Sequence, residues 1–317
     1  MNLRALITGP TGFVGQRVCT QAMLNGVAIH CALRRQEKVL DGATPFLIKE
    51  LNGLTEWQPT LSGVDVVIHL AARVHVLHDA VDDPPAAYRT VNVDGTLNLA
   101  RQAAAAGVKR FVFVSSIKVN GEYSELERPF SESDACNPQD AYGQSKLEAE
   151  LGLRQISVDT GMEVVIIRPP LVYGPGVKAN FAALMRAVQL GWPLALGAVY
   201  NRRSLVALDN LVDFILACAI HPKAANQTFM VSDGHDLSTT ELVRGLARAA
   251  GMPARLLPVP VWILEVGASL LGKGGEVRRL CGNLQVDISK AKTLLGWQPP
   301  VSVEEGLRRA VAGTPVS

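Results

Sequence analysis

The stretch Leu6-Ile7-Thr8-Gly9-Pro10-Thr11-Gly12-Phe13-Val14-Gly15 decides the fold. A short apolar run ends in three glycines at GxxGxxG spacing, and a helical pattern over Gly15–Asn25 follows. A pyrophosphate lies on a helix N-terminus only where backbone N–H groups approach it without a Cβ in the way. No Lys-Ser or Lys-Thr pair follows the glycines, so the pattern is not a Walker loop. A plain tight turn is the alternative, but the position before an alternating α/β pattern favours a dinucleotide site.

Outward from this stretch, the first 175 residues alternate strand-like and helix-like patterns. Short runs rich in Val, Ile and Phe are typical of strands buried on both faces of a parallel sheet. These runs are Arg4–Thr8, Val27–Leu33, Val64–Leu70, Arg110–Ser115 and Glu163–Arg168. Helical patterns separate them, at Gly15–Asn25, Tyr88–Ala106 and Ala141–Asp159. The alternation predicts right-handed crossovers and an α/β fold of the Rossmann type, with a doubly wound parallel sheet.

After Gly176 the chain changes character, because Pro and Gly become frequent and the apolar runs become short. Phe229–Ser232 is a candidate for one more strand of the sheet. Helices are predicted at Leu237–Ala250, Asp287–Leu295 and Val303–Ala312, and the first begins with a capping box, Ser238 three residues before Glu241. We expect a dinucleotide-binding domain with the catalytic residues over 1–175. A smaller mixed lobe over 176–317 would bind substrate and close over the carboxyl edge of the sheet, with segments near 204–220 and 226–232 returning to the first domain.

Composition and charge exclude several classes of protein. With 48% hydrophobic and 19% charged residues, the 317-residue chain is globular rather than disordered. The net charge of +2 provides no basic field for nucleic acid. Five scattered cysteines show neither metal-ligand nor disulfide spacing, which is typical of reduced thiols. The apolar run within Val259–Gly272 contains Pro260 and Glu265 and is shorter than the ~18 residues of a membrane span. We therefore expect a cytoplasmic protein with no membrane span, no nucleic-acid partner and no metal site.

The second predicted strand ends in Ala32-Leu33-Arg34-Arg35, where a dinucleotide fold meets the cofactor's ribose. An acidic residue there would accept a hydrogen bond from the 2′-hydroxyl and repel a 2′-phosphate. Leu33 forms no such bond, and guanidinium groups bind phosphate oxygens in a fork. The pattern favours NADP(H) over NAD(H). The alternative is that both arginines are a solvated strand exit.

A proton-transfer set follows farther along the chain. Tyr142 and Lys146 are four residues apart and share one face of a predicted helix. The Lys146 ammonium would favour the phenolate of Tyr142 and lower its pKa toward the working pH. Upstream, Phe113-Val114-Ser115-Ser116 ends a strand and presents a serine hydroxyl at the carboxyl edge of the sheet. Ser, Tyr and Lys together suit hydride transfer at a carbinol carbon.

These motifs resemble the extended short-chain dehydrogenases/reductases, in their nucleotide-sugar epimerase/dehydratase branch. The resemblance runs from Thr8-Gly9 to Leu295-Gly296-Trp297-Gln298-Pro299. The blocks that carry it are His69-Leu70-Ala71-Ala72, Asn92-Val93-Asp94-Gly95-Thr96, Tyr142-Gly143-Gln144-Ser145-Lys146 and Arg168-Pro169-Pro170-Leu171-Val172-Tyr173-Gly174-Pro175. Within the branch, Ser115-Ser116-Ile117-Lys118-Val119-Asn120-Gly121-Glu122 resembles two groups of enzymes. One group reduces UDP-4-keto-6-deoxy-N-acetylhexosamine in bacterial polysaccharide synthesis, and the other comprises some UDP-glucose 4-epimerases.

The resemblance implies roles for individual residues. Tyr142 would be the acid/base, Lys146 would orient the nicotinamide ribose, and Ser116 would hold the C4 oxygen of the sugar. The implied cofactor-binding residues are Gly9, Thr11, Gly12, Phe13, Val14, Arg34, Arg35, Glu50, Leu51, Leu70, Ala71, Ala72, Tyr142, Lys146 and Pro169. The implied substrate-binding residues are Arg73, Ser116, Lys118, Tyr142, Asn180, Arg203 and Arg278. For Asn180 a helix cap is the alternative, and for Arg203, which follows Arg202, a surface position.

The chain departs from the family pattern at several positions. Leu33 replaces the acidic ribose residue of NAD-using epimerases, and Glu50-Leu51 replaces the usual Asp-Leu near the adenine. Lys118 and Asn120 stand where many epimerases carry a small polar residue and a tyrosine, so we expect a different sugar pocket. Arg73 would bring a positive charge toward the active site.

The expected function is therefore an NAD(P)-dependent enzyme acting on a UDP-sugar. The main prediction is reduction of the C4 keto group of a UDP-4-keto-6-deoxy-N-acetylhexosamine with NADPH, and the alternative is a UDP-hexose or UDP-N-acetylhexosamine 4-epimerase. A steroid- or flavonoid-type hydroxyl dehydrogenase and a non-catalytic cofactor-binding protein are further alternatives. The resemblance also implies a homodimer built from the helices at Tyr88–Ala106 and Ala141–Asp159.

Overall fold

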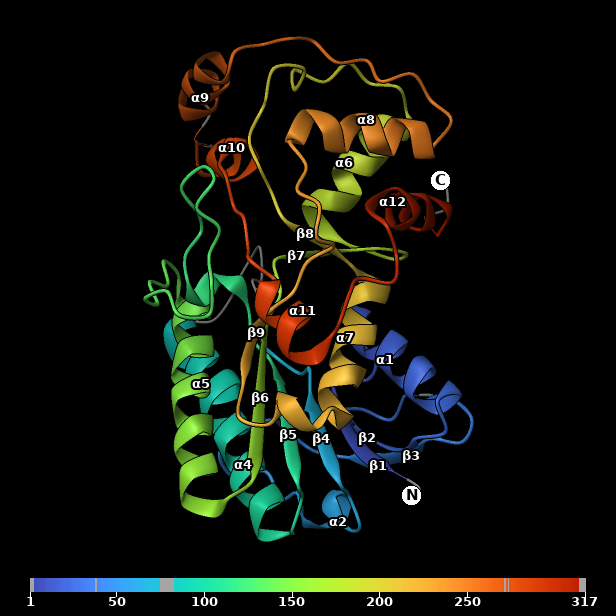
Figure 1. Cartoon of the computed structure of the whole chain (residues 1–317), viewed down its shortest axis with the longest axis vertical. Coiled ribbons are helices and arrows are strands. Elements are labelled where there is room, and N and C mark those ends of the chain that lie inside the picture. Colours follow the sequence, from blue (N-terminus) through green and yellow to red (C-terminus); the bar gives the residue numbers. More distant parts are fainter. Residues whose placement is uncertain (1–2, 38, 75–82, 271, 273, 314–317) are drawn as a thin grey trace.

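Helices cover both faces of a parallel β-sheet in the computed structural model of the chain (Figure 1). The structure describes residues 3–37, 39–74, 83–270, 272 and 274–313. Within these ranges, seven strands lie in the order β3-β2-β1-β4-β5-β6-β9, and all neighbours are parallel. Their bounds are β1 Arg4–Thr8, β2 Ala28–Leu33, β3 Thr44–Leu47, β4 Val66–His69, β5 Arg110–Val114, β6 Glu163–Arg168 and β9 Thr228–Met230. The order reverses at β1, which confirms the predicted doubly wound α/β fold of the Rossmann type.

Two apolar clusters, one on each face of the sheet, explain why these runs form strands. In β4, Val66 and Ile68 belong to one cluster and Val67 belongs to the other. Successive side chains of a strand point to opposite faces, so a strand between two helical layers must be apolar throughout. Helices α1 (Phe13–Leu24) and α7 (Leu208–Ile220) cover the first face. Helices α2 (Gln58–Leu61), α4 (Gly95–Ala105) and α5 (Ala141–Thr160) cover the second.

The helix predicted at Tyr88–Ala106 consists of three segments. Helix α3 (Pro84–Tyr88) leads into a π-helical turn, η1 (Arg89–Asp94), and α4 follows. Asp83 caps α3, since its side chain accepts a hydrogen bond from the backbone N–H of Ala86 at 3.0 Å. The helical path therefore begins earlier than the sequence pattern indicates.

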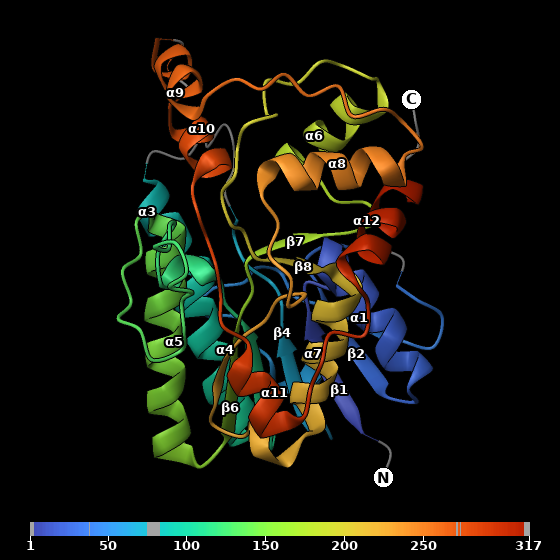
Figure 2. The ribbon, with the colours of Figure 1, turned by 45° about the horizontal axis from the view of Figure 1, so that its top comes forward.

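A second group of elements lies above the carboxyl ends of the strands (Figure 2). Strands β7 (Leu171–Tyr173) and β8 (Leu205–Ala207) pair in parallel, and α6 (Ala179–Gln189), α8 (Thr239–Ala249) and α12 (Val303–Ala312) pack around a third apolar cluster with them. Helices α9 (Val261–Leu270) and α10 (Gly274–Cys281) pack on each other farther out. Short 3₁₀ segments η2 (Ile117–Val119) and η3 (Pro222–Ala224) and helix α11 (Ser289–Leu295) complete the elements.

The capping box predicted at α8 is confirmed. The Ser238 hydroxyl accepts from the Glu241 backbone N–H at 3.1 Å, and the Glu241 carboxylate accepts from the Ser238 backbone N–H at 2.7 Å. The strand predicted near Phe229 is also present as β9, which pairs with β6 although β7, α6 and β8 lie between them in sequence. In the described ranges, no helix combines the length and the apolarity that crossing a bilayer requires.

Candidate functional site

Two glycines let the turn after β1 fold back on itself. Gly9 has φ +68°, and a Cβ there would lie 3.0 Å from the backbone nitrogen of Ala71. A Cβ on Gly15 would lie only 1.9 Å from the carbonyl oxygen of Gly9. The Gly12 backbone N–H donates to that same carbonyl at 3.1 Å. Only residues without a side chain permit this close turn, which brings the chain directly into α1.

The N-terminus of α1 is open toward solvent. Gly12 occupies the N-cap position without a side-chain cap, and the first turn carries no acidic residue. Thr11 and Gly12 are exposed, and Phe13 and Val14 begin the helix. Free N–H groups at the positive end of a helix dipole bind phosphate well. The residues present therefore fit the pyrophosphate of a dinucleotide cofactor.

The predicted ribose and adenine residues lie at the ends of β2 and β3. Leu33 is buried as the last residue of β2, and Arg34 and Arg35 are exposed just beyond it. Glu50 is exposed and its carboxylate accepts from the Asn52 side chain at 2.9 Å, whereas Leu51 is buried. These positions agree with a cofactor lying along this edge. They do not distinguish NADP(H) from NAD(H), because both arginines point into solvent.

A buried histidine supports the turn after β4. His69 contacts Thr8 Oγ1 through Nδ1 at 2.7 Å and Thr96 Oγ1 through Nε2 at 2.9 Å. Burial lowers the pKa of His69 to about 3, so its imidazole is neutral. Thr8 Oγ1 also accepts from the backbone N–H groups of Leu70 and Ala71, each at 3.2 Å. Half-buried Leu70, Ala71 and Ala72 are thereby fixed beside Gly9. His69 is predicted only as part of a motif, and its supporting role is visible only in the structure.

Of the two serines after β5, Ser116 faces the site. Ser115 is buried and donates to Glu150 Oε1 at 2.5 Å. Ser116 begins η2, lines a pocket, and shares a hydrogen bond with Tyr142. Its neighbour Ile117 donates its backbone N–H to the carbonyl of Pro169 at 3.0 Å, which joins this turn to the end of β6. The structure thus brings Ser116 and Tyr142 together, as the sequence pattern predicts.

Lys146 is buried one helical turn after Tyr142 on α5. Its ammonium nitrogen donates to the Val114 carbonyl at 2.9 Å and lies 4.4 Å from the centre of the Phe113 ring. The same nitrogen is 6.0 Å from the centre of the Tyr142 ring. Burial lowers the pKa of Lys146 to about 7, against a smaller opposing effect of Glu150.

The expectation that Lys146 lowers the pKa of Tyr142 is wrong for this structure. Burial raises the pKa of the Tyr142 phenol above its usual value, and the Asp140 and Tyr88 side chains raise it further. Among the described residues, the hydrogen bond with Ser116 acts in the opposite direction. The main physical reason is that burial of the phenol disfavours its charged form.

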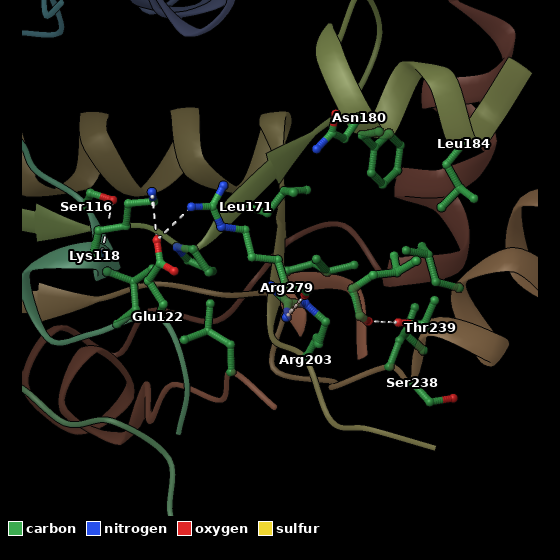
Figure 3. A pocket seen from close by; sticks show the side chains of 18 of the residues that line it. Ser116, Lys118, Glu122, Leu171, Asn180, Leu184, Arg203, Ser238, Thr239 and Arg279 are labelled. Carbon is green, nitrogen blue, oxygen red and sulfur yellow. Dashed lines mark hydrogen bonds and ion pairs between the residues drawn. The ribbon is translucent and has the colours of Figure 1, made fainter. Parts of the chain in front are cut away.

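A cavity of about 380 Å³ opens beside these residues (Figure 3). Ser116, just after β5, and Tyr142 of α5 line it, together with Asn180 of α6, Arg203 and Arg279 of α10. Most of its remaining wall is apolar. The apolar residues are Ile117, Pro170, Leu171, Phe181, Leu184, Leu205, Leu237, Leu242, Leu280 and Leu284. Charged and polar side chains, among them Arg203, Arg279 and Asn180, thus lie in a mostly apolar wall.

Asn180 and Arg203 both line the pocket. Lys178, not Asn180, occupies the N-cap of α6, so Asn180 is a pocket residue rather than a cap. Arg203 is half-buried in the pocket wall, while Arg202 is exposed. Arg203 donates to the carbonyls of Arg279 at 2.6 Å and Gly282 at 3.0 Å. Within the described residues no carboxylate pairs with Arg203, and burial lowers its pKa.

Arg278, which we expect to bind substrate, lies outside the described pocket lining. Arg279 lines the pocket, and the described lining does not include Arg278, which is exposed. Successive helical residues point about 100° apart, so only one of the two guanidinium groups of α10 reaches the cavity. The sequence shows two adjacent arginines but not the rotation of the helix.

Lys118 and Arg73 both contact other side chains of the protein. The Lys118 ammonium forms an ion pair with Asp140 and lies 3.2 Å from Glu122 Oε1. Lys118 also lines the pocket. The Arg73 guanidinium lies 5.8 Å from the centre of the Tyr88 ring, and that ring lies 6.2 Å from the Tyr142 ring. Arg73 therefore approaches Tyr142 through Tyr88 and is not part of the described pocket lining.

Glu122 and Thr239 are pocket residues that the sequence analysis does not identify as site residues. Glu122 bridges Lys118 and Arg279, whose guanidinium nitrogen lies 3.4 Å from its carboxylate (Figure 3). Thr239 is buried in the first turn of α8, and its hydroxyl donates to the Leu280 carbonyl at 2.6 Å. The spacing of Lys118 and Glu122, four residues apart, is the one signal that could have pointed to their pairing.

Comparisons with known proteins identify the family of this chain. The model of the NAD dependent epimerase/dehydratase family matches residues 5–232. A UDP-glucose 4-epimerase of Vibrio cholerae is 50% identical over 305 residues, which cover 96% of this chain and 93% of that protein.

Solved structures show the same fold. A Thermotoga maritima UDP-glucose 4-epimerase with UDP-glucose superposes with TM-score 0.78 at 24% identity and covers 98% of both chains. A Thermus thermophilus UDP-glucose 4-epimerase in complex with NAD gives TM-score 0.78 at 22% identity, again over 98% of both chains. With its glycine turn, its Ser/Tyr/Lys set and a family match over most of its length, this chain is an enzyme that belongs to the NAD-dependent epimerase/dehydratase family.

Proposed function

We propose that this enzyme is a 4-epimerase of a UDP-hexose or UDP-N-acetylhexosamine. The observation that carries the proposal is one pocket lined both by the Ser116–Tyr142 pair and by the guanidinium of Arg203, which has no carboxylate partner among the described residues. A proton-transfer group and a cation at separate places suit a sugar whose anomeric oxygen carries a diphosphate. The relative from Vibrio cholerae supports the same reaction, because half of its residues are shared over nearly the whole chain. It favours the epimerase, the alternative expectation, over the 4-keto reductase.

The chain's own residues perform the acid/base part of the reaction. Tyr142 removes the proton of the C4 hydroxyl and later returns one to the C4 oxygen. Ser116 holds that oxygen by a hydrogen bond. A bound nicotinamide dinucleotide supplies hydride acceptance and return at C4, chemistry that protein side chains lack.

The diphosphate would be bound by the lobe that faces the sheet. Arg203 offers a guanidinium without a carboxylate partner among the described residues, and Asn180 adds an amide. Arg279 is partnered by Glu122 at 3.4 Å and is half-exposed, so it can turn toward a phosphate. Arginine binds phosphate oxygens through two parallel N–H groups, which fixes the orientation of the diphosphate as well as its position.

The 4-keto reductase with NADPH is the second candidate, and the end of β2 is the observation that favours it. Buried Leu33 followed by exposed Arg34 and Arg35 lacks the carboxylate that would accept from an NAD ribose. The Thermus relative binds NAD, which points slightly against this candidate. An epimerase regenerates its cofactor in each turnover, whereas a reductase consumes a hydride and needs exchange with a reducing pool.

Incubation of the purified enzyme with UDP-galactose or UDP-N-acetylgalactosamine, without added cofactor, tests the proposal. We expect conversion to the gluco epimer, and no conversion by Tyr142→Phe purified in parallel. Denaturation should release a nicotinamide dinucleotide in stoichiometric amount, to be identified by mass. No interconversion by enzyme that does hold cofactor, together with NADPH-dependent reduction of a UDP-4-keto-6-deoxy sugar, would establish the second candidate instead.

A further inference from the structure

Lys118 lies in the pocket wall but is occupied by two carboxylates. Its ammonium forms an ion pair with Asp140, and Glu122 Oε1 lies 3.2 Å from the same nitrogen. Figure 3 shows the contact with Glu122. All three side chains are at least two-thirds buried. These two contacts direct two of the three N–H donors of the Lys118 ammonium at protein carboxylates. The contacts therefore direct Lys118 toward the protein rather than toward the sugar.

Asp140 connects Lys118 to the helix that carries the acid/base residue. Asp140 is the N-cap of α5, and its Oδ1 accepts from the Gly143 backbone N–H at 2.7 Å. Its Oδ2 receives the Lys118 ammonium. Each carboxylate oxygen therefore has a separate task, one to begin the helix and one to hold the lysine. Tyr142 follows two residues after Asp140, in the first turn of α5.

We propose that Lys118 is a positioning residue for Tyr142 that acts through Asp140 and does not bind the sugar. It clamps the Asp140 carboxylate against the start of α5 and offsets the negative charge beside the phenol. This inference rests on the proposed function only in taking Tyr142 as the acid/base.

The charged groups around Tyr142 explain how Lys118 offsets the negative charge beside the phenol. Apart from burial, the groups that raise the pKa of Tyr142 are Asp140 on its own helix and Tyr88 on α3. Ser116, after β5, lowers it, and the Lys146 ammonium lies 6.0 Å from the ring. Arg73 lies behind Tyr88. Among these described groups, Asp140 is the carboxylate that raises the pKa of Tyr142. Lys118 is the cation paired with it.

Asp140 stays ionised in this environment. Burial alone would raise its pKa, but the Lys118 ion pair and the Gly143 N–H hydrogen bond outweigh burial and hold the pKa below its usual value. Arg279 contributes in the same direction from α10. If Lys118 is removed, the Asp140 charge acts on Tyr142 without compensation. Ionisation of Tyr142 then becomes harder, because a neighbouring negative charge disfavours a phenolate.

Two substitutions separate charge from helix capping. Lys118→Met removes the counter-charge, and Asp140→Asn removes the carboxylate charge but keeps a good N-cap, since Asn caps helices about as well as Asp. Their combination forms a double-mutant cycle with the parent. Lys118→Arg is the conservative rescue. Lys109→Met is the matched control, because Lys109 also pairs with a carboxylate that accepts a backbone N–H, that of Asp65, at 3.3 Å and far from the pocket.

The first measurement is the pH dependence of kcat in the epimerase assay. We expect the acidic limb to move up by about 0.5–1 pH unit in Lys118→Met and down in Asp140→Asn. The double variant should follow Asp140→Asn, Lys118→Arg should lie near the parent, and KM should change by less than about 2-fold throughout. A KM increase that persists when Lys118→Met is made in the Asp140→Asn background would mean that Lys118 contacts the sugar, and would overturn the proposal.

The second measurement needs no activity. Amide hydrogen exchange at Gly143 should accelerate by about 5-fold in Lys118→Met, because the unclamped Asp140 caps less well. Lys109→Met should leave Gly143 unchanged. Unaltered Gly143 exchange in Lys118→Met would refute the positioning role whether or not the enzyme epimerises sugars. Failure of the parent enzyme in the epimerase assay, with the exchange result as expected, would instead count against the proposed function alone.

Discussion

Tyr142 is held by Ser116 and packs edge-on to the Tyr88 ring, whose centre lies 6.2 Å away. Its phenol is the one proton-transfer group that both shares a hydrogen bond with a pocket hydroxyl and lies in the pocket lining among the described residues. We expect Tyr142→Phe to lower kcat by roughly 10²–10⁴-fold, the usual value of a positioned acid/base, while cofactor still co-purifies. Steady-state kinetics and cofactor release measure the two effects.

Ser115→Ala is the comparison for that variant, because Ser115 binds Glu150 inside the protein rather than the pocket. It should reduce stability more than it reduces kcat. Turnover by Tyr142→Phe within a few-fold of the parent would remove Tyr142 from the mechanism.

Lys146 gives the cofactor-free protein a pH-dependent stability. Its pKa is about 7 when folded and 10.5 when unfolded, because burial opposes its charge. Between these values the unfolded state binds more protons, so the free energy of unfolding rises with pH by up to about 1.4 kcal/mol per unit. We expect urea unfolding between pH 7.5 and 9.5 to show this rise relative to Lys146→Met. Parallel pH dependences of the two proteins would show that Lys146 titrates normally.

Arg34 is the residue through which cofactor choice can be tested. If its guanidinium binds a 2′-phosphate, its loss costs about 1.5–3 kcal/mol, the value of a hydrogen bond to a charged group. Arg34→Ala should then weaken NADPH binding by roughly 10–100-fold and leave NADH nearly unchanged. Calorimetric titration of both cofactors, with Arg35→Ala alongside, decides the question. Equal or tighter binding of NADH by the parent would contradict a phosphate-reading role for either arginine.

At the residue scale, the sequence predicts site residues correctly where their spacing along helices and strands determines their positions. Tyr142 and Lys146 lie on one helix after a strand that ends in Ser116, and the structure brings Ser116 and Tyr142 into hydrogen-bond contact. The sequence does not predict properties that depend on the burial of a side chain or on the rotation of a helix about its axis. Desolvation reverses the expected direction of the Tyr142 pKa, and rotation of α10 selects Arg279 over Arg278.

At the level of secondary-structure elements, the approach of α1 to β1 depends on Gly15. A methyl group there would lie 1.9 Å from the Gly9 carbonyl oxygen, so the helix must shift. We expect Gly15→Ala to lower the free energy of unfolding by about 2–3 kcal/mol and to weaken cofactor binding. Chemical denaturation and cofactor titration measure both effects.

Gly267→Ala is the matched control for Gly15→Ala. Gly267 lies within α9, and a Cβ on it would meet nothing within 4 Å. It should be neutral or stabilise the protein by up to about 1 kcal/mol, because Ala is the better helix former. A Gly15→Ala protein as stable as this control would mean that the turn accommodates a side chain.

The elements that the sequence predicts well are those buried on both sides. Strands β1 and β6 begin and end as the apolar runs indicate, because a central strand must be apolar throughout. Strand β3 escapes prediction because it is a partly exposed edge strand that contains Pro45. Strands β7 and β8 are three residues each, too short for any periodicity to appear.

At the scale of the whole molecule, the homodimer implied by the family resemblance remains to be tested. On α5, Leu151 and Val158 are 58% and 81% exposed, two large apolar side chains seven residues apart and so on one face of the helix. Burial of such a stripe against a second copy would stabilise association. We expect a dimer by sedimentation equilibrium and a monomer for Leu151→Glu.

Leu24→Glu serves as the control for that experiment, because Leu24 is 74% exposed at the end of α1 on the other side of the sheet. It should remain dimeric. A parent that sediments as a monomer, or a dimer that survives Leu151→Glu, would remove α5 from the interface.

The sheet receives its last strand late. Strand β9 pairs with β6 only after the chain has passed through β7, α6, β8 and α7. During synthesis at about 5–20 residues per second, the nascent chain therefore carries β6 as an open edge for several seconds. Unpaired edges recruit other strands, so this interval is when the emerging polypeptide is most prone to aggregate and most dependent on chaperones. Residues Thr228–Met230 form β9 and pair with β6. A chain that stalls or is truncated before them would leave the edge of β6 without its partner strand.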